Sequence, residues 1–146
     1  HNNNTKVAGA VAEEYMEGSV PISWMIVNDG YGCGYGVGPS VFPHDIDTLT
    51  SVSQDLRASR IITGLWSGTD FSHLEDEISK ANVRVLKTDV EMVGEGGHIA
   101  FDWVTKAQQA ILNYSDARPF IWTIEGWAGT QRKAVMWTGD NAGNFD

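Results

Sequence analysis

The sequence predicts an α/β fold built on a parallel sheet. Segments with helical spacing of apolar residues alternate with short, continuously apolar segments along the 146 residues, and such short segments are typical of strands buried on both faces. Strands separated by helices favour parallel pairing. Two architectures fit, an open doubly wound sheet or part of a (β/α)8 barrel, and about five strands would form only an arc of a barrel.

The first half of the chain predicts two helices around one strand. Residues 6–17 have a helical pattern that ends at Gly18. The apolar run 22–27 follows a proline and predicts a strand, after which the glycine-rich stretch 28–38 predicts a loop. Residues 45–58 predict the second helix, because one face carries Ile46, Leu49, Val52 and Leu56.

The second half continues the alternation. Residues 60–66 predict a strand, and the spacing of Ser72 and Glu75 is that of a capping box at a helix start. A third strand is expected over 83–88 and a long amphipathic helix over 98–114. The last expected elements are a strand over 120–124 and a short strand over 134–137.

Charge and composition exclude several classes of function. The net charge of −9 argues against nucleic acid or an anionic membrane surface as a partner. No apolar run approaches the roughly 20 residues of a membrane span. One cysteine excludes an intramolecular disulfide and a cysteine-rich zinc site, and the four histidines lack metal-ligand spacing. No metal and no cofactor are therefore expected.

Acidic side chains follow the predicted strands, where each strand ends. Ligands bind at the carboxyl ends of parallel strands in both candidate architectures. The carboxylates expected to converge at this edge are Asp29, Asp89, Glu125 and Asp140. Carboxylates beside aromatic platforms suit glycoside hydrolysis, although a single aspartate after a strand is more often a helix cap or turn residue.

The six tryptophans divide into two groups by their place in this pattern. Trp66, Trp127 and Trp137 fall near the ends of predicted strands and are candidates for contact with a sugar. Trp24, Trp103 and Trp122 fall within predicted strands and a helix, and these three are expected in the core.

Four segments resemble glycoside hydrolase family 31, the α-glucosidases and related α-glucosyltransferases. Residues 132–141 read RKAVMWTGDN, which is similar to the family segment that ends in Trp-(Thr/Ser)-Gly-Asp. Residues 87–91 (KTDVE) fall where the family carries its nucleophile strand. Their Lys-x-Asp-Val pattern resembles a subgroup that includes cycloalternan-forming transferases, as do residues 28–32 and 126–132.

The resemblance implies roles for single residues. Asp89 would be the catalytic nucleophile, Asp140 the general acid/base, and Asp29 the carboxylate that holds sugar hydroxyls. Lys87 would help to keep nearby carboxylates charged, or is an ordinary strand-edge lysine. Arg132 would bind a carboxylate or a substrate hydroxyl, or packs beside the turn. The residues expected to bind substrate are Asp29, Trp66, Lys87, Glu125, Trp127, Arg132 and Trp137.

The resemblance also implies how the chain is organised. Residues 1–146 would be a fragment of a single catalytic (β/α)8 barrel domain, about its second to sixth strands, inactive alone and completed by the remainder of the parent barrel. The substrate would be an α-glucan or α-gluco-oligosaccharide. Two alternatives are a carbohydrate-binding module without turnover and a small doubly wound domain with a structural or regulatory role.

Overall fold

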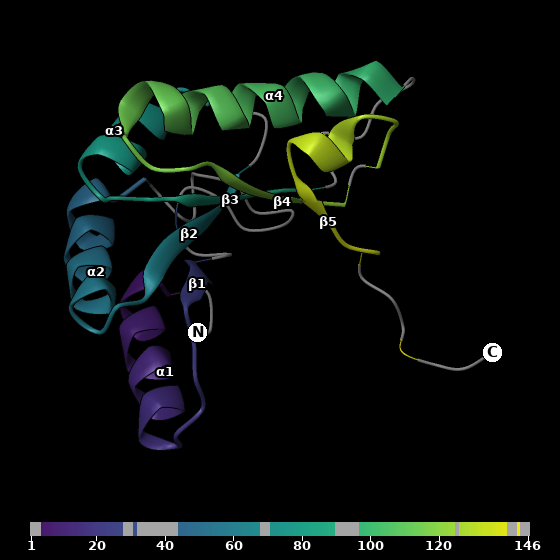
Figure 1. Ribbon diagram of the computed structural model, residues 1–146. Helices are drawn as coiled ribbons and strands as arrows, with labels where there is room; N and C mark the ends of the chain where they lie inside the picture. The colour runs from purple at the N-terminus through teal and green to yellow at the C-terminus, as the bar shows by residue number, and fades with distance from the viewer. Residues whose placement is uncertain are drawn as a thin grey trace.

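The structure is a computed structural model that describes residues 4–27, 31, 44–67, 71–89, 97–124, 126–139 and 143. Helices and strands alternate along the described chain, except that a short 3-10 helix, η2, joins the last two strands (Figure 1). The elements are α1 (Thr5–Glu17), β1 (Trp24–Val27), α2 (Ile46–Ala58), β2 (Ile62–Ser67), α3 (Leu74–Ser79), β3 (Val85–Thr88), α4 (Gly97–Tyr114), β4 (Phe120–Thr123), η2 (Thr130–Arg132) and β5 (Val135–Met136).

The five strands form one sheet in the order β1-β2-β3-β4-β5, and every neighbouring pair is parallel. The four α-helices lie along one side of this sheet (Figure 1). A doubly wound sheet has a point where the strand order reverses, with helices on both faces. The sequential order and one-sided helices instead confirm the expectation of an arc of a (β/α)8 barrel, and the doubly wound alternative is wrong.

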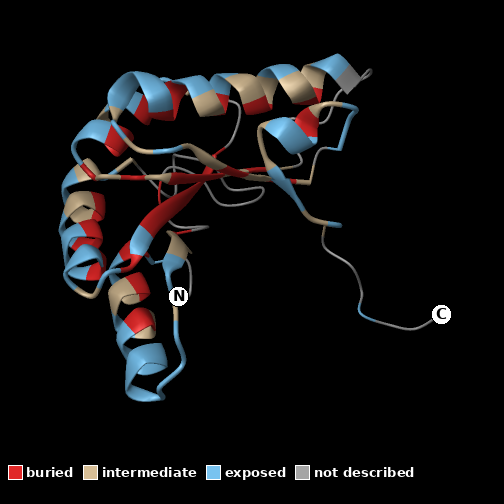
Figure 2. Ribbon diagram, viewed as in Figure 1, coloured by how far each residue is buried: buried red, intermediate tan, exposed pale blue. Residues whose placement is uncertain are grey.

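The face toward the helices holds the hydrophobic core. Leu65, Leu86 and Ile121 occupy paired positions on neighbouring strands, so their side chains share this outer face. They belong to one buried cluster with helix residues such as Leu49 and Ile78. Figure 2 shows the buried residues along the strands and on the helix sides that face them. Burial of these apolar surfaces fixes the helices to the sheet.

The opposite face of the sheet is concave. Trp24 on β1 contacts two rings on β4, with centroid separations of 5.8 Å to Phe120 and 5.6 Å to Trp122. Three strand spacings in a flat sheet would separate β1 from β4 by about 14 Å. The rings meet because the sheet curls, as a barrel wall does.

Most predicted elements are confirmed to within two residues of their bounds, while some local expectations are wrong. Helix α3 begins at Leu74, its N-cap is His73, and His73 makes no side-chain capping hydrogen bond, so Ser72 is not the N-cap of a capping box. Trp24 is 39% exposed instead of buried, because it lies on the concave face and not under the helices. The predicted glycine-rich loop lies largely outside the described residues. In the described part, no helix has the length and apolar character to cross a membrane.

Candidate active site

An ion pair with little exposure to solvent marks the carboxyl end of the central strand. Asp89 directly follows β3, and Lys87 precedes it by two residues, so both side chains extend to the same side of the sheet. The Lys87 Nζ lies 3.0 Å from Asp89 Oδ2. The side chains of Lys87 and Asp89 are only 12% and 13% exposed. Two opposite charges are thus held together at the edge where parallel sheets bind ligands.

The neighbouring strand adds a second donor to the same oxygen. Trp66 on β2 pairs in register with Lys87, which places its indole on the concave face beside the lysine. Its Nε1–H donates to Asp89 Oδ2 over 3.0 Å. An ammonium and an indole N–H therefore converge on one carboxylate oxygen, and both interactions favour the ionised form of Asp89.

Aromatic rings enclose the other side of the Lys87 ammonium. Trp122 on β4 pairs in register with Lys87, and Trp137 follows β5. The Lys87 Nζ lies 4.9 Å from the centroid of the Trp137 ring and 5.7 Å from that of Trp122. These two rings pack on each other at 5.1 Å. Ring faces attract a cation, so this aromatic cage stabilises the ammonium where little water reaches it.

This arrangement gives the Asp89 carboxylate a charged partner and a neutral donor from two different strands. Such contacts stabilise the charge of a carboxylate and restrict its direction. An ionised, oriented carboxylate beside aromatic rings suits nucleophilic or electrostatic catalysis at an anomeric carbon.

Three predicted site residues lie outside the described residues: Asp29, Glu125 and Asp140. Trp127 lies in the turn before η2 and is 57% exposed. No described ring contact joins Trp127 to the cage around Lys87.

The structure does not bring Arg132 to Asp89. Arg132 ends η2 and lines a pocket of about 570 Å³ with Arg118, Pro119 and Val135. Proline 119 precedes β4 and Val135 begins β5, so this pocket lies at the amino ends of the strands, opposite Asp89. The position favours the alternative in which Arg132 packs beside the turn.

A second cluster lies after β1 and before α3. Tyr31 is 4% exposed and its ring meets His44 edge-on at 5.4 Å, while His44 stacks on His73 at 3.8 Å. Burial, followed by the charge and hydrogen bond of Glu77, raises the pKa of Tyr31 well above its ordinary value. Among the described residues, no group of three or more His, Cys, Asp or Glu side chains could hold a metal ion.

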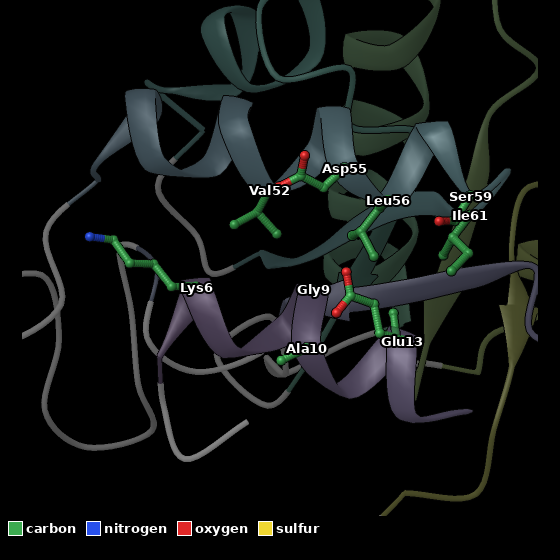
Figure 3. Close-up of a pocket in the computed structure, with 10 residues that line it drawn as sticks. Lys6, Gly9, Ala10, Glu13, Val52, Asp55, Leu56, Ser59 and Ile61 are labelled. Atoms are coloured by element: carbon green, nitrogen blue, oxygen red, sulfur yellow. The ribbon is translucent and has the colours of Figure 1, made fainter. Parts of the chain in front are cut away.

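A further pocket, of about 230 Å³, lies between α1 and α2 (Figure 3). Its lining combines Lys6, Glu13 and Asp55 with apolar Val52 and Leu56. Both helices cover the outer face of the sheet, so this pocket is separated from Asp89 by the sheet itself.

The sequence interpretation missed one residue of the cage and one contact. Trp122 was expected in the core, but it lies on the concave face beside Lys87. Alternation along β4 was the available signal, because Ile121 faces the helices and its neighbour must face the other way. No sequence signal gives the Trp66–Asp89 hydrogen bond, which depends on the register between β2 and β3.

Comparison with known proteins gives two kinds of match. Residues 103–146 match the family model described as the TIM-barrel domain of glycosyl hydrolases family 31. The chain is 50% identical over 40 residues to glucosidase 2 subunit alpha of Saccharomyces cerevisiae, which covers 27% of this chain and 4% of that protein. It is 31% identical over 87 residues to alpha-glucosidase 2 of Bacillus thermoamyloliquefaciens, covering 55% of this chain and 11% of that protein.

The matched regions are therefore a small part of both relatives, 4% and 11% of their lengths. The family match includes the segment that ends in Trp137-Thr138-Gly139-Asp140. The parallel, one-sided arc of the sheet agrees with the barrel fold of the matched family model, and both relatives are named as glucosidases. These matches do not distinguish the cycloalternan-type subgroup.

Proposed function

We propose that this chain belongs to the catalytic barrel of a family 31 glycoside hydrolase that cleaves α-linked glucosides with retention of configuration. The observation that carries the proposal is the Asp89 carboxylate, held by Lys87 and Trp66 at the carboxyl end of β3. The family match over residues 103–146 supports the same reaction class independently, because it does not contain Asp89.

The proposed reaction has two steps that use two carboxyl groups. In the first, an oxygen of Asp89 bonds to the anomeric carbon as the glycosidic bond breaks, and Asp140 gives its proton to the departing oxygen. In the second, Asp140 takes a proton from water or a sugar hydroxyl. The oxygen of that acceptor bonds to the anomeric carbon, and Asp89 leaves as a carboxylate. Each step inverts the configuration at the anomeric carbon, so the two steps together retain it.

The electrostatic surroundings of Asp89 support its role as the nucleophile. A nucleophilic carboxylate must be ionised when substrate binds, while the acid must carry a proton. Lys87 and the Trp66 N–H both stabilise the charged form of Asp89. We therefore assign Lys87 to the charge state of Asp89 rather than to an ordinary strand edge.

Substrate binding is proposed for the side chains at the same end of the sheet. The aromatic surface of Trp137 lies beside Lys87 and supplies an apolar platform. Asp29, Glu125 and Trp127 follow β1 and β4 in sequence and complete the proposed set. The glucosidase names of both relatives support an α-linked glucoside or gluco-oligosaccharide as substrate. The acceptor of the glucosyl group is water in hydrolysis and a second sugar in transfer.

We also propose that the chain is one arc of a single barrel domain. Apolar side chains on the concave face are open to solvent in this arc: Trp24 is 39% exposed, Ile62 46% and Val135 50%. Further strands that continue the curvature would cover them. The small share of both relatives that the chain matches supports a larger catalytic unit.

The test is to replace each carboxylate in the full-length protein and to follow hydrolysis of an aryl α-glucoside. Asp89→Ala should reduce turnover to background, and Asp140→Ala should reduce it by about 100- to 10,000-fold. Asp76→Ala, at an exposed position on α3, is the matched control and should retain activity. Proton NMR of the first product should show the α-anomer.

Two outcomes would contradict the proposal. Full activity of Asp89→Ala or Asp140→Ala removes that residue from the reaction. Sugar binding without turnover in the unmodified protein would favour the carbohydrate-binding alternative. Product analysis with added oligosaccharide measures transfer against hydrolysis.

A further inference from the structure

We propose that the aromatic cage of Trp122 and Trp137 is a binding site for an alkylammonium group, which the side chain of Lys87 occupies. Trp122 is thereby a positioning residue that acts on Asp89 through Lys87. This inference rests on the proposed function and adds to it a residue outside the proposed substrate-binding set. The starting observation is that the Lys87 Nζ lies 5.7 Å from the centroid of the Trp122 ring and 4.9 Å from that of Trp137.

The cage has two walls that come from different parts of the sheet. Trp122 belongs to β4 and pairs in register with Lys87, whereas Trp137 follows β5. A ring face attracts a cation that lies within about 6 Å of its centroid. The two rings lie 5.1 Å apart, with 38° between their planes. The ammonium group of Lys87 is therefore within reach of two aromatic rings at once.

A third ring supports Trp122 from another strand. Trp24 on β1 meets the Trp122 ring nearly edge-on, with the centroids 5.6 Å apart and 74° between the planes. The rings thus hold one another through contacts that do not include Lys87. We therefore expect the cage to keep its shape when the lysine side chain is shortened, and to accept a separate alkylammonium ion in its place.

The same ammonium group contacts the proposed nucleophile. The Lys87 Nζ lies 3.0 Å from Asp89 Oδ2, and the lysine side chain is 12% exposed. A lysine ammonium is a point charge on a flexible four-carbon stem, so its position depends on the groups around it. Loss of the Trp122 ring removes one of these groups. Trp122 can in this way affect turnover without contact with the reacting atoms.

The first test is a double-mutant cycle in the full-length protein. Trp122→Leu should lower kcat/KM for an aryl α-glucoside by about 3- to 30-fold, which corresponds to one cation–π contact shielded from water. In the Lys87→Met background, the same substitution should change kcat/KM by less than about 2-fold, because the cation is already absent. Equal losses in both backgrounds would overturn the inference.

The matched control uses a second contact between a tryptophan and a lysine. Trp103 lies on α4, and the Nζ of the exposed Lys106 is 4.2 Å from the centroid of its ring. This helix covers the outer side of the sheet (Figure 1). Trp103→Leu should leave kcat/KM unchanged. A loss as large as that in Trp122→Leu would overturn the inference, because loss of aromatic packing alone would then explain both.

The second test is chemical rescue of Lys87→Ala. This substitution removes Cγ, Cδ, Cε and Nζ, and the n-propylammonium ion supplies the same atoms. Propylammonium chloride should raise kcat/KM of Lys87→Ala by about 3- to 10-fold, with saturation, since the ion would bind the vacated cage. Sodium chloride and 1-propanol at the same concentrations should give no recovery. Absence of rescue, or equal rescue by 1-propanol, would overturn the inference.

A binding measurement tests the cage without turnover. Saturation-transfer NMR should detect propylammonium bound to Lys87→Ala. A tryptophan face binds a cation better than a phenylalanine face, and leucine has no ring, so the signal should weaken from Trp to Phe to Leu at position 122. Trp122→Phe keeps an aromatic ring and serves if Trp122→Leu folds poorly. Equal signals for Trp122 and Trp122→Phe would overturn the inference.

These outcomes separate the inference from the proposed function. Equal losses in the cycle or an unrescued Lys87→Ala, with Asp89→Ala inactive, would overturn the inference alone. Activity in Asp89→Ala would overturn the proposed function and, with it, the positioning role of Trp122. The NMR signal of bound propylammonium would still test the cage in that case, because it needs no reaction.

Discussion

Asp89 and Lys87 are charged side chains in a mostly apolar setting, and each depends on the other. Lys87 Nζ contacts Asp89 Oδ2 at 3.0 Å and is enclosed by the rings of Trp122 and Trp137. This pair is much less exposed than the ion pair Lys80–Asp76, whose side chains are 60% and 48% exposed. Replacing the lysine of each pair and measuring kcat/KM compares their contributions to turnover.

Lys87→Met in the full-length protein should lower kcat/KM by about 10- to 100-fold, because the ionised carboxylate loses its charged partner. Methionine keeps an unbranched apolar stem inside the cage. Lys80→Met removes the exposed pair on α3 and should leave kcat/KM unchanged. Equal values of kcat/KM for Lys87→Met and the unsubstituted protein would show that the pair has no catalytic role.

Sequence reasoning reached part of this site. Residues two apart on a strand share a face, so Lys87 and Asp89 could be placed together from their spacing. The contact between Trp66 and Asp89 could not be predicted from the sequence. A one-residue change of register between β2 and β3 would turn the indole toward the helices. Asp29, Glu125 and Asp140 stay predictions, since they lie outside the described residues.

Gly64 in β2 leaves no room for a side chain between its two neighbouring strands. A Cβ built there would lie 2.9 Å from Val85 Cβ and 3.0 Å from Ile26 Cγ1, on the two neighbouring strands. Real Cβ atoms need more room than this, and Val85 is itself 3% exposed. A glycine therefore permits the packing of the concave face at this point.

Gly64→Ala should lower the free energy of unfolding by about 1–3 kcal/mol, as overpacking of a core does. Gly9→Ala is the matched control, since its Cβ in α1 would meet no atom within 4 Å. Alanine suits a helix better than glycine, so Gly9→Ala should raise stability by about 0.5–1 kcal/mol. Chemical denaturation measures both, and a neutral Gly64→Ala would mean that the strands can separate without cost.

Helix α2 begins at a titratable cap. Asp45 Oδ2 accepts the hydroxyl of Thr48 at 2.7 Å and Oδ1 accepts its backbone N–H at 3.0 Å. These hydrogen bonds lower the pKa of Asp45 below its ordinary value of 3.8. A lowered pKa in the folded state means that the cap stabilises α2 above that ordinary value, and this stabilisation is lost as pH falls through the folded-state pKa.

Hydrogen exchange of the Thr48 amide should report this loss. Its protection factor should fall in the unsubstituted protein as the pH drops below about 5 and on through the folded-state pKa, which lies below 3.8. Asp45→Asn keeps an oxygen acceptor that does not titrate there, so its protection should stay nearly constant over this range. Asp55→Asn, later in the same helix, should behave like the unsubstituted protein. If the protection factor of the Thr48 amide changed with pH in the same way in all three proteins, the role of Asp45 as a titratable cap would be refuted.

Element bounds were predictable where apolar periodicity is strong. Helix α2 and strand β4 match their predicted ranges closely, because one side of each packs on the core. The start of α3 could not be predicted from the capping-box spacing alone, because the helix begins at the buried Leu74 and its N-cap is His73. Trp24 shows the same limit, because a curved sheet has two different faces and the short apolar run does not identify which one is concave.

At the scale of the molecule, the curved sheet carries the apolar core on one face and the candidate active site on the other. The outer face, covered by the helices, holds the apolar core (Figure 2). The concave face holds the rings of Trp24, Trp122 and Trp137 and the charged pair of Lys87 with Asp89. Substitutions on the outer face should therefore act on folding, and those at the carboxyl ends of the concave face on turnover.

A covalent bond between Asp89 and the sugar would show directly that Asp89 is the nucleophile. The most direct measurement is to inactivate the full-length protein with a fluorinated α-glucosyl fluoride, digest it, and locate the added glycosyl mass by tandem mass spectrometry. We expect one labelled peptide with the sugar on Asp89, and no label in Asp89→Ala. A label on any other residue, or inactivation with unmodified Asp89, would exclude Asp89 as the nucleophile.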